Sequence, residues 1–355
     1  MYEKKFITKR AKKLAPYVAG EQPKDKKYIK LNTNENPYSP SPKIKEEIIK
    51  EFQNLYLYPD TNSVELCKAI AEVENVGADC VFCGNGSDEI LSFVFYAFFD
   101  NDLPLLFPDI TYSFYPVYAN YYDIPYKEIP LNKDFEIVAE DYLQSASGII
   151  FPNPNAPTSV YLNHEEICKL LKYHSEKVVT VDEAYIAFGG ESMVSFINQY
   201  PNLLITRTFS KSHALAGMRV GYAIGQPYLI EELRRVKDSF NSYTIDRIAA
   251  VVAKTAILDK EYYDEINNKI INTRDKFIEN VKKIGFTVCL SKANFVFISH
   301  ESIQASELYL KLKERGILVR YFNKHRIDNY LRISIGTDKD MDYVFNVLSE
   351  FMKNV

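Results

Sequence analysis

The feature that most limits the fold of this chain is a regular alternation of short apolar runs with helix-length segments between residues 64 and 235. Each run is bounded by turn-forming or polar residues, and the runs lie at 80–84, 103–107, 148–154, 177–185, 202–210 and 219–225. Segment 164–176 between two of them has helical periodicity, with Asn163 placed as its N-cap. Strands separated by helices predict an α/β domain with a mostly parallel sheet, which binds ligands outside the carboxyl ends of its strands.

The C-terminal third of the chain has a different pattern. Residues 244–284 contain neither proline nor glycine and predict one long helix that leads out of the α/β domain. The patterns that follow read β-α-β-β-α and predict a smaller α+β domain. A chain of 355 residues is long enough for two domains that share a cleft. We expect an N-terminal arm at 1–29 packed on the small domain, a large domain at 30–262 and a small domain at 263–355.

Composition argues against several kinds of protein. A formal net charge of −4 disfavours nonspecific binding of nucleic acid, which needs a basic face. The apolar run at 90–99 is much shorter than the roughly 18 residues that span a membrane, and no secretory signal is apparent. Cys80 and Cys83 form a C-x-x-C without a second ligand pair, so we expect core cysteines, no disulfide framework and no metal site. The cytoplasm is the expected location.

Glycines and small polar residues follow the first apolar run. Gly84, Gly86 and Ser87 precede a helical segment, whose free N–H groups and positive end can hold an anion. A plain strand-to-helix turn capped by Ser87 or Asp88 explains the same residues equally well. The G-K-[ST] ending of a nucleotide P-loop is absent, which disfavours a nucleoside triphosphate.

Asp182 stands at the end of a later apolar run, and Tyr185 follows three residues on. A carboxylate at the end of a buried strand is costly unless it meets a cation. That cation is either a basic side chain, in a structural salt bridge, or the protonated ring nitrogen of a ligand.

Lys211 follows the next run, within the segment TFSKSHALAGMRVGY at 208–222. Most lysines in loops are surface residues, but Thr208, Ser210 and Arg219 nearby are side chains that bind phosphate, and a lysine beside them is a Schiff-base candidate. Three strand ends thus offer the groups that pyridoxal phosphate needs. Hydrogen-bond donors suit its phosphate, a carboxylate suits its pyridine nitrogen, and an amine suits its aldehyde.

Several motifs, in order and spacing, resemble those of the aspartate-aminotransferase-like, fold type I pyridoxal-phosphate enzymes: NPNAPTS (153–159), VDEAY (181–185) and the segment at 208–222. Further motifs narrow the resemblance to the histidinol-phosphate aminotransferases: PYVAGEQP (16–23), LNTNENPYSPSP (31–42), YPD (58–60) and YLRISIGT (330–337). The resemblance covers nearly the whole chain. It implies an α/β fold in which a large domain has a mostly parallel seven-stranded sheet flanked by helices, with a smaller α+β C-terminal domain.

The resemblance also implies roles for individual residues. Lys211 would bond to the cofactor aldehyde and move a proton, Asp182 would pair with the pyridinium nitrogen, and Tyr185 would hydrogen-bond the phenolic oxygen of the ring. The remaining cofactor contacts comprise a tyrosine stacked on the ring, an asparagine at the ring oxygen and groups that hold the phosphate. Tyr112 would stack on the ring, and Asn155 would contact the ring oxygen. The phosphate would be held by Gly86, Ser87, Asp88, Thr208, Ser210 and Arg219, together with Tyr58 from the other subunit of a homodimer.

The implied substrates are L-histidinol phosphate and 2-oxoglutarate, which give imidazole acetol phosphate and glutamate in histidine biosynthesis. Arg332 resembles the arginine that grips the substrate carboxylate, and Arg320 and Tyr17 resemble residues that bind the substrate phosphate. The plainer explanation of Arg332 is a strand arginine at a domain interface, and that of Arg320 is a surface charge. An aromatic-amino-acid aminotransferase or a threonine-phosphate decarboxylase would share this machinery, and a noncatalytic metabolite-binding protein would share the fold.

Two positions depart from the usual N-P-N-N-P-T-G. Ala156 stands where an asparagine normally hydrogen-bonds the ring oxygen, so that either Asn155 takes over the contact or Tyr185 carries it alone. A hydrogen bond of this kind is worth about 1 kcal/mol, which does not exclude activity. Ser159 replaces a glycine and affects the local turn.

Overall fold

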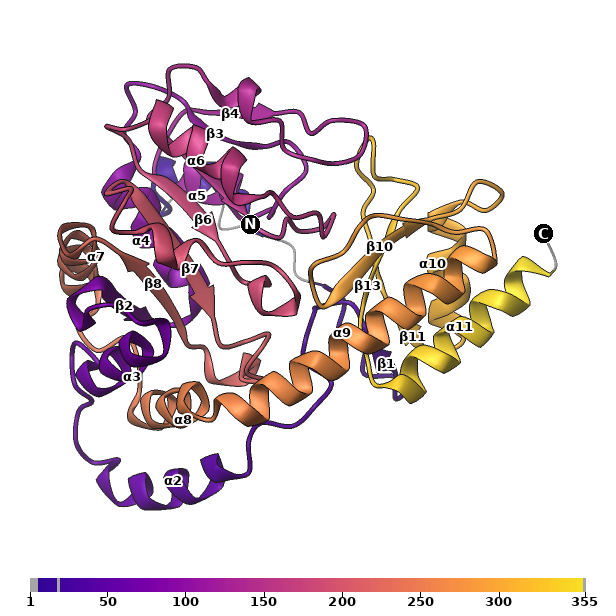
Figure 1. The fold of residues 1–355 in the computed structure, drawn as a ribbon, viewed down its shortest axis with the longest axis horizontal. Helices are drawn as coiled ribbons and strands as arrows, with labels where there is room; N and C mark the ends of the chain where they lie inside the picture. The colour runs from indigo at the N-terminus through magenta and orange to yellow at the C-terminus, as the bar shows by residue number, and fades with distance from the viewer. Residues whose placement is uncertain (1–5, 18–19, 354–355) are drawn as a thin grey trace.

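The structure is a computed structural model that describes residues 6–17 and 20–353. Residues 1–5 and 18–19 of the predicted arm lie outside the described part. A large α/β unit and a smaller α+β unit stand side by side, and helix α9 (Lys260–Lys283) runs from one to the other (Figure 1). No helix in the described part of the chain is long and apolar enough to cross a bilayer.

The large unit is built on a seven-stranded sheet with the order β2-β8-β7-β6-β5-β3-β4. Strands β3 to β7 pair in parallel, and β8 alone runs against its neighbours β7 and β2. The mostly parallel sheet is therefore confirmed. The strands are β2 (Val81–Gly84), β3 (Leu105–Pro108), β4 (Tyr126–Ile129), β5 (Gly148–Pro152), β6 (Val179–Asp182), β7 (Leu203–Thr208) and β8 (Gly221–Gly225).

Helices cover both faces of this sheet because its central strands are apolar on both sides. In β5, Ile149 and Phe151 join one core and Ile150 joins the other. The first core is closed by α3 (Val64–Glu74), α6 (His164–Tyr173) and α8 (Arg247–Leu258), and the second by α4 (Gly86–Phe98), α5 (Tyr115–Tyr121) and α7 (Pro227–Phe240). The predicted N-cap is confirmed, since the Asn163 side chain accepts a hydrogen bond from the Glu166 N–H at 3.1 Å.

The predicted single helix over 244–284 is wrong, because the segment forms two helices, α8 and α9, that meet at Asp259. The backbone of Asp259 leaves the helical region at φ −91° and ψ 52°. Its carboxylate accepts hydrogen bonds from Ser41 and Lys43, both at 2.5 Å. These partners lie just before and within α2 (Lys43–Glu51), so a contact distant in sequence holds the break.

The small unit has a four-stranded antiparallel sheet with the order β12-β13-β10-β9. Its elements follow the predicted β-α-β-β-α pattern, with two of the expected strands divided: β9 (Thr287–Val288), β10 (Phe295–Ser299), α10 (Ala305–Glu314), β11 (Ile317–Leu318), β12 (Arg320–Tyr321), β13 (Leu331–Ser334) and α11 (Asp338–Met352). The N-terminal region contributes the short helix α1 (Lys9–Lys13) and β1 (Ile29–Lys30), which pairs in parallel with β11.

Candidate active site

A cleft of about 590 Å³ opens where the two units and the N-terminal region meet. Its walls come from three parts of the chain that are far apart in sequence. They include Tyr17 and 32–34 from the N-terminal region, Tyr112, Ala156, Tyr185 and Lys211 from the large unit, and Arg320, Phe322 and Arg332 from the small unit. The cleft thus brings Lys211 and Tyr185 to the same cavity as the three residues predicted to bind substrate.

Lys211 lies just beyond the carboxyl end of β7, where its ammonium group points into the cleft. Its Nζ donates a hydrogen bond to the Thr33 carbonyl oxygen at 3.1 Å and lies 5.9 Å from the centre of the Tyr185 ring. Burial, reinforced by the nearby charge of Arg332, lowers the pKa of Lys211 to about 8. A lysine with this pKa is neutral in a useful fraction near neutral pH, as a nucleophile or a general base must be.

Asp182 ends β6, and only 4% of its surface is exposed. The neighbouring Glu183 meets Arg207 at 2.9 Å, whereas no basic side chain among the described residues forms an ion pair with Asp182. Its carboxylate accepts hydrogen bonds from the Ala184 N–H at 3.2 Å and, weakly, from the Tyr115 hydroxyl at 3.4 Å. Burial therefore raises the pKa of Asp182 to about 7. The structural salt bridge that the sequence left open for Asp182 is made by Glu183 instead.

An anion cradle forms at the start of α4. Gly86 has φ +78°, and a Cβ there would lie 2.6 Å from a guanidinium nitrogen of Arg219. A Cβ on Gly221 would likewise lie 2.6 Å from the Ser87 backbone nitrogen, so glycine at both positions allows the loop and β8 to approach closely. Arg219 pairs with Asp88 at 3.2 Å across this loop. The loop offers N–H groups, a positive helix end and a guanidinium to one anion.

Hydrogen bonds order the segments between this cradle and the cleft. The Tyr112 hydroxyl donates to Asp88 at 2.7 Å, which fixes a ring that lines the cavity. The Thr208 hydroxyl accepts from the Ser210 N–H at 3.1 Å, which shapes the turn that leads from β7 to Lys211. Asp88 at the cradle is thus linked to Tyr112, which lines the cleft together with Lys211.

Arg332 lies on β13 at the back of the cleft. One terminal nitrogen donates to the Asn32 carbonyl oxygen at 2.9 Å, and its buried Nε has no hydrogen-bond partner in the described structure. Burial lowers the pKa of Arg332, and the positive charge of Arg320 lowers it further. The Tyr17 ring stacks on Phe114 with 4.4 Å between ring centres, so the N-terminal region closes the opposite side of the cavity. Two guanidinium groups that line one cavity are suited to an anionic ligand.

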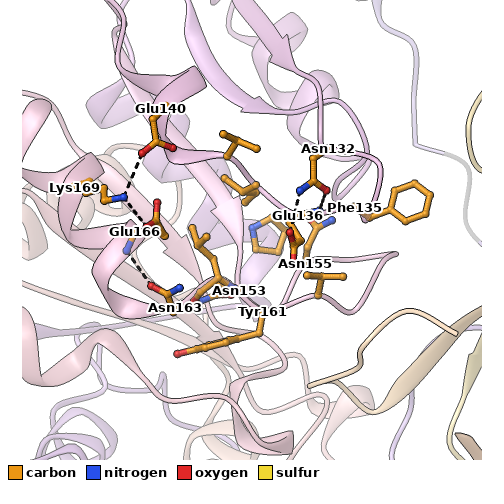
Figure 2. Close-up of a pocket in the computed structure, with 15 residues that line it drawn as sticks. Asn132, Phe135, Glu136, Glu140, Asn153, Asn155, Tyr161, Asn163, Glu166 and Lys169 are labelled. Carbon is orange, nitrogen blue, oxygen red and sulfur yellow. Dashed lines mark hydrogen bonds and ion pairs between the residues drawn. The ribbon is translucent and has the colours of Figure 1, made fainter.

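Asn155 is a predicted cofactor residue that does not line this cleft. The Asn155 amide donates to the Ile110 carbonyl and to the Thr158 hydroxyl, both at 2.9 Å. Asn155 lines a second pocket of about 370 Å³, where Figure 2 shows it beside Asn132 and Glu136. The structure therefore offers no free Asn155 donor to replace the asparagine missing at Ala156.

Tyr58 does not line the cleft of its own chain either. It is 78% exposed and stacks on Tyr243 with 4.7 Å between ring centres. Its ring partner Tyr243 and the Arg247 side chain that binds its carbonyl oxygen do not line the cleft either.

Asn34 lines the cleft and was not predicted from the sequence. Its amide nitrogen donates to the Tyr185 hydroxyl at 3.0 Å. It also contacts Ser334 on β13, which lies 300 positions away in the sequence. The signal in the sequence that could have indicated Asn34 is the recurrence of asparagine in NTNENP. Asparagine tolerates a positive φ, and Asn34 has φ 56°.

Comparisons with known proteins identify the family of this chain. A family model described as aminotransferase class I and II matches residues 26–348. The histidinol-phosphate aminotransferase of Clostridium acetobutylicum is 53% identical over 352 residues, which cover 99% of this chain and 98% of the relative. That of Clostridium botulinum strain Langeland is 51% identical over 352 residues, with 99% of each chain covered. The chain belongs to the histidinol-phosphate aminotransferase family.

Solved structures of this family share the fold. The crystal structure of the histidinol-phosphate aminotransferase from Clostridium acetobutylicum is 28% identical in sequence, has a TM-score of 0.86 and covers 92% of this chain and 100% of that one. The enzyme from Sinorhizobium meliloti, in complex with pyridoxal-5'-phosphate, is 23% identical, has a TM-score of 0.87 and covers 98% and 97%. The predicted fold type I architecture is confirmed.

Proposed function

We propose that the protein uses pyridoxal phosphate to transfer the amino group of L-histidinol phosphate to 2-oxoglutarate, in histidine biosynthesis. The observation that carries the proposal is a pair of groups at the ends of two neighbouring parallel strands: an uncompensated buried carboxylate at Asp182 and, lining the cleft, a lysine of lowered pKa at Lys211. When bound, the cofactor supplies an electron-withdrawing ring next to the substrate carbon that carries the amino group.

The residues present fit this cofactor. Asp182 lacks a cationic partner among the described side chains, and a protonated ring nitrogen would supply one. The cradle of Gly86, Ser87 and Arg219 would hold the phosphate, and Tyr112 would cover one face of the ring. These contacts would hold the reactive end of the cofactor against Lys211.

Lys211 would act as both the covalent anchor and the proton carrier. With its pKa lowered to about 8, it exchanges a proton near neutral pH, at a position fixed by the Thr33 carbonyl. Arg332 would bind the substrate anion, which would satisfy the Nε that the folded chain leaves without a partner. One anion site suits both substrates in turn, because 2-oxoglutarate carries a carboxylate where histidinol phosphate carries a phosphate.

The substrate is tested by comparing kcat/KM for histidinol phosphate, phenylalanine and threonine phosphate with 2-oxoglutarate as acceptor. We expect histidinol phosphate to be preferred over both competitors, as the name of the 53% identical relative indicates. The anion site alone does not decide the preference, because phenylalanine also carries a carboxylate and threonine phosphate also carries a phosphate. Preference for phenylalanine would indicate an aromatic aminotransferase. Carbon dioxide release from threonine phosphate would indicate a decarboxylase.

We further propose a homodimer in which Tyr58 contacts the phosphate in the other subunit. The segment around it exposes an unusual run of apolar side chains, including Phe52 at 69% and Tyr56 at 82%. Arg247 donates to the Tyr58 carbonyl oxygen at 3.1 Å, which ties this loop to the start of α8. Exposed apolar patches of this kind mark protein interfaces.

Mixing two defective variants tests this arrangement. Tyr58→Ala alone is expected to weaken cofactor binding about tenfold, which corresponds to one hydrogen bond to a charged group. A hybrid dimer with Lys211→Ala would contain one site with both native residues, so refolded mixtures should regain activity at low cofactor concentration. If Tyr58 acted within its own chain, no mixture would regain it.

The three-part division at residues 29 and 262 and the cytoplasmic location also stand as proposals. The second boundary falls inside the continuous helix α9, which would make that helix the mechanical link between the two domains. Pairing of β1 with β11 supports an N-terminal arm that packs on the small domain.

A further inference from the structure

Tyr185 is the polar side chain best placed to meet the ring oxygen of a cofactor bonded to Lys211. Its ring lies 5.9 Å from the Lys211 ammonium group, on the same wall of the cleft. Ala156 packs in the same small apolar cluster as Tyr185 and carries no hydrogen-bonding side chain. Asn155, the next residue along, has both amide hydrogens committed elsewhere. The direction in which the Tyr185 hydroxyl donates its proton therefore matters more here than in a site with a second donor.

Asn34 contacts that hydroxyl and is itself held by the small unit. Its backbone N–H donates to the Ser334 hydroxyl at 2.9 Å, and its backbone carbonyl accepts from the Asn294 amide at 3.0 Å. The Ser334 hydroxyl donates to the Asn34 side-chain oxygen at 2.9 Å. Asn34 is 2% exposed. All of its polar groups are thus engaged, and the residue is fixed at φ 56°.

These contacts decide which end of the Asn34 amide faces Tyr185. Since the Ser334 hydroxyl donates to Oδ1, the Nδ2 group is the end that meets Tyr185, at 3.0 Å. An amide nitrogen can only donate, so the Tyr185 oxygen must accept. The hydroxyl proton of Tyr185 is then free to point away from Asn34 and into the cleft. An amide with the opposite orientation would accept that proton and withdraw it from the cofactor.

We propose that Asn34 is a positioning residue that directs the Tyr185 hydroxyl to donate to the phenolic oxygen of the bound cofactor, with Ser334 holding Asn34 in the required orientation. The inference rests on the proposed cofactor. It also gives the small unit, through Ser334 and Asn294, a direct connection to the electronic state of the cofactor ring. A hydrogen bond to that oxygen stabilises its anionic form and increases cofactor affinity.

The test is a double-mutant cycle between Asn34→Gly and Tyr185→Phe, because glycine accepts the φ of Asn34 without strain. Two quantities are measured: the Kd of pyridoxal phosphate for the cofactor-free protein, and the pH midpoint of the visible absorption change of the loaded protein. Each single variant should weaken binding by about five- to tenfold and raise the midpoint by about 0.5 to 1 pH unit. In the Tyr185→Phe background, Asn34→Gly should change the Kd by less than about twofold and the pH midpoint by less than about 0.2 pH unit.

The control is Asn75→Gly, since Asn75 has nearly the same backbone conformation (φ 55°) at the end of α3, outside the cleft. It should leave both the Kd and the midpoint unchanged. Ser334→Ala provides a second route if Asn34→Gly does not fold, and it should show the same non-additivity with Tyr185→Phe. Additive effects, or an unchanged midpoint in both variants, would overturn the role of Asn34. Failure of the unaltered protein to bind pyridoxal phosphate would instead reject the proposed function.

Discussion

Replacement of Lys211 by alanine is expected to lower the rate of transamination by at least about 10⁴-fold. The substitution removes both the amine that would anchor the cofactor and the group that would move the proton. It should leave the fold intact, because the Lys211 side chain donates a single hydrogen bond within the described structure, to the Thr33 carbonyl, and its charge is destabilised by burial. Cofactor affinity should fall but not vanish, since the cradle around Arg219 and the Tyr112 ring remain.

The measurement combines turnover with chemical trapping. Borohydride should fix the cofactor of the unaltered protein on one peptide, the one that contains Lys211, and should fix none on the Lys211→Ala variant. Lys169→Ala is the control, because Lys169 lies in the second pocket between Glu140 and Glu166 (Figure 2) and should keep full activity. Retained turnover in Lys211→Ala, or label on another lysine, would remove Lys211 from this role.

The parts of the fold that were predicted correctly depend on local patterns. Apolar runs such as those at 148–154 and 202–210 became buried parallel strands because both of their faces are apolar. Edge strand β4 was not among the predicted runs, since three of its four residues are exposed and its sequence YKEI has no apolar run. The break at Asp259 was missed for a different reason. It depends on Ser41 and Lys43, more than 200 residues away, and no local pattern encodes that contact.

The same distinction holds for the site. Lys211 and Tyr185 could be placed in one cleft because each follows the end of a parallel strand, and such ends meet at one edge of the sheet. Asn34 and Ser334 could not, because they meet only when the N-terminal region packs against β13. The position of Asn155 also depends on its hydrogen bonds to Ile110 and Thr158, which a motif alone does not reveal.

Replacement of Asp182 by asparagine is expected to lower the activity of the loaded protein and to raise the stability of the cofactor-free protein. The variant keeps the shape but cannot stabilise a protonated ring nitrogen, so activity should fall by about 10²- to 10⁴-fold. Without cofactor, the same change should stabilise the protein at neutral pH. The pKa of Asp182 is raised from 3.8 to about 7 in the folded state, so folding favours the protonated carboxyl. Its stability contribution is complete below pH 3.8 and is lost as the pH rises through about 7.

The decisive measurement is the difference in unfolding free energy between Asp182→Asn and the unaltered protein, both free of cofactor, from pH 4 to pH 8. A difference is needed because His213, whose pKa burial lowers to about 4, contributes a slope of opposite sign between that value and 6.5. The variant should gain on the order of a few kcal/mol across this range. Saturating pyridoxal phosphate should reverse the order, since a bound cation lowers the pKa of Asp182 and makes the charged carboxylate the favourable form. A flat difference in the absence of cofactor would mean that Asp182 already has a cationic partner in the folded chain, and the fit of the site to a pyridinium ring would lose its main support.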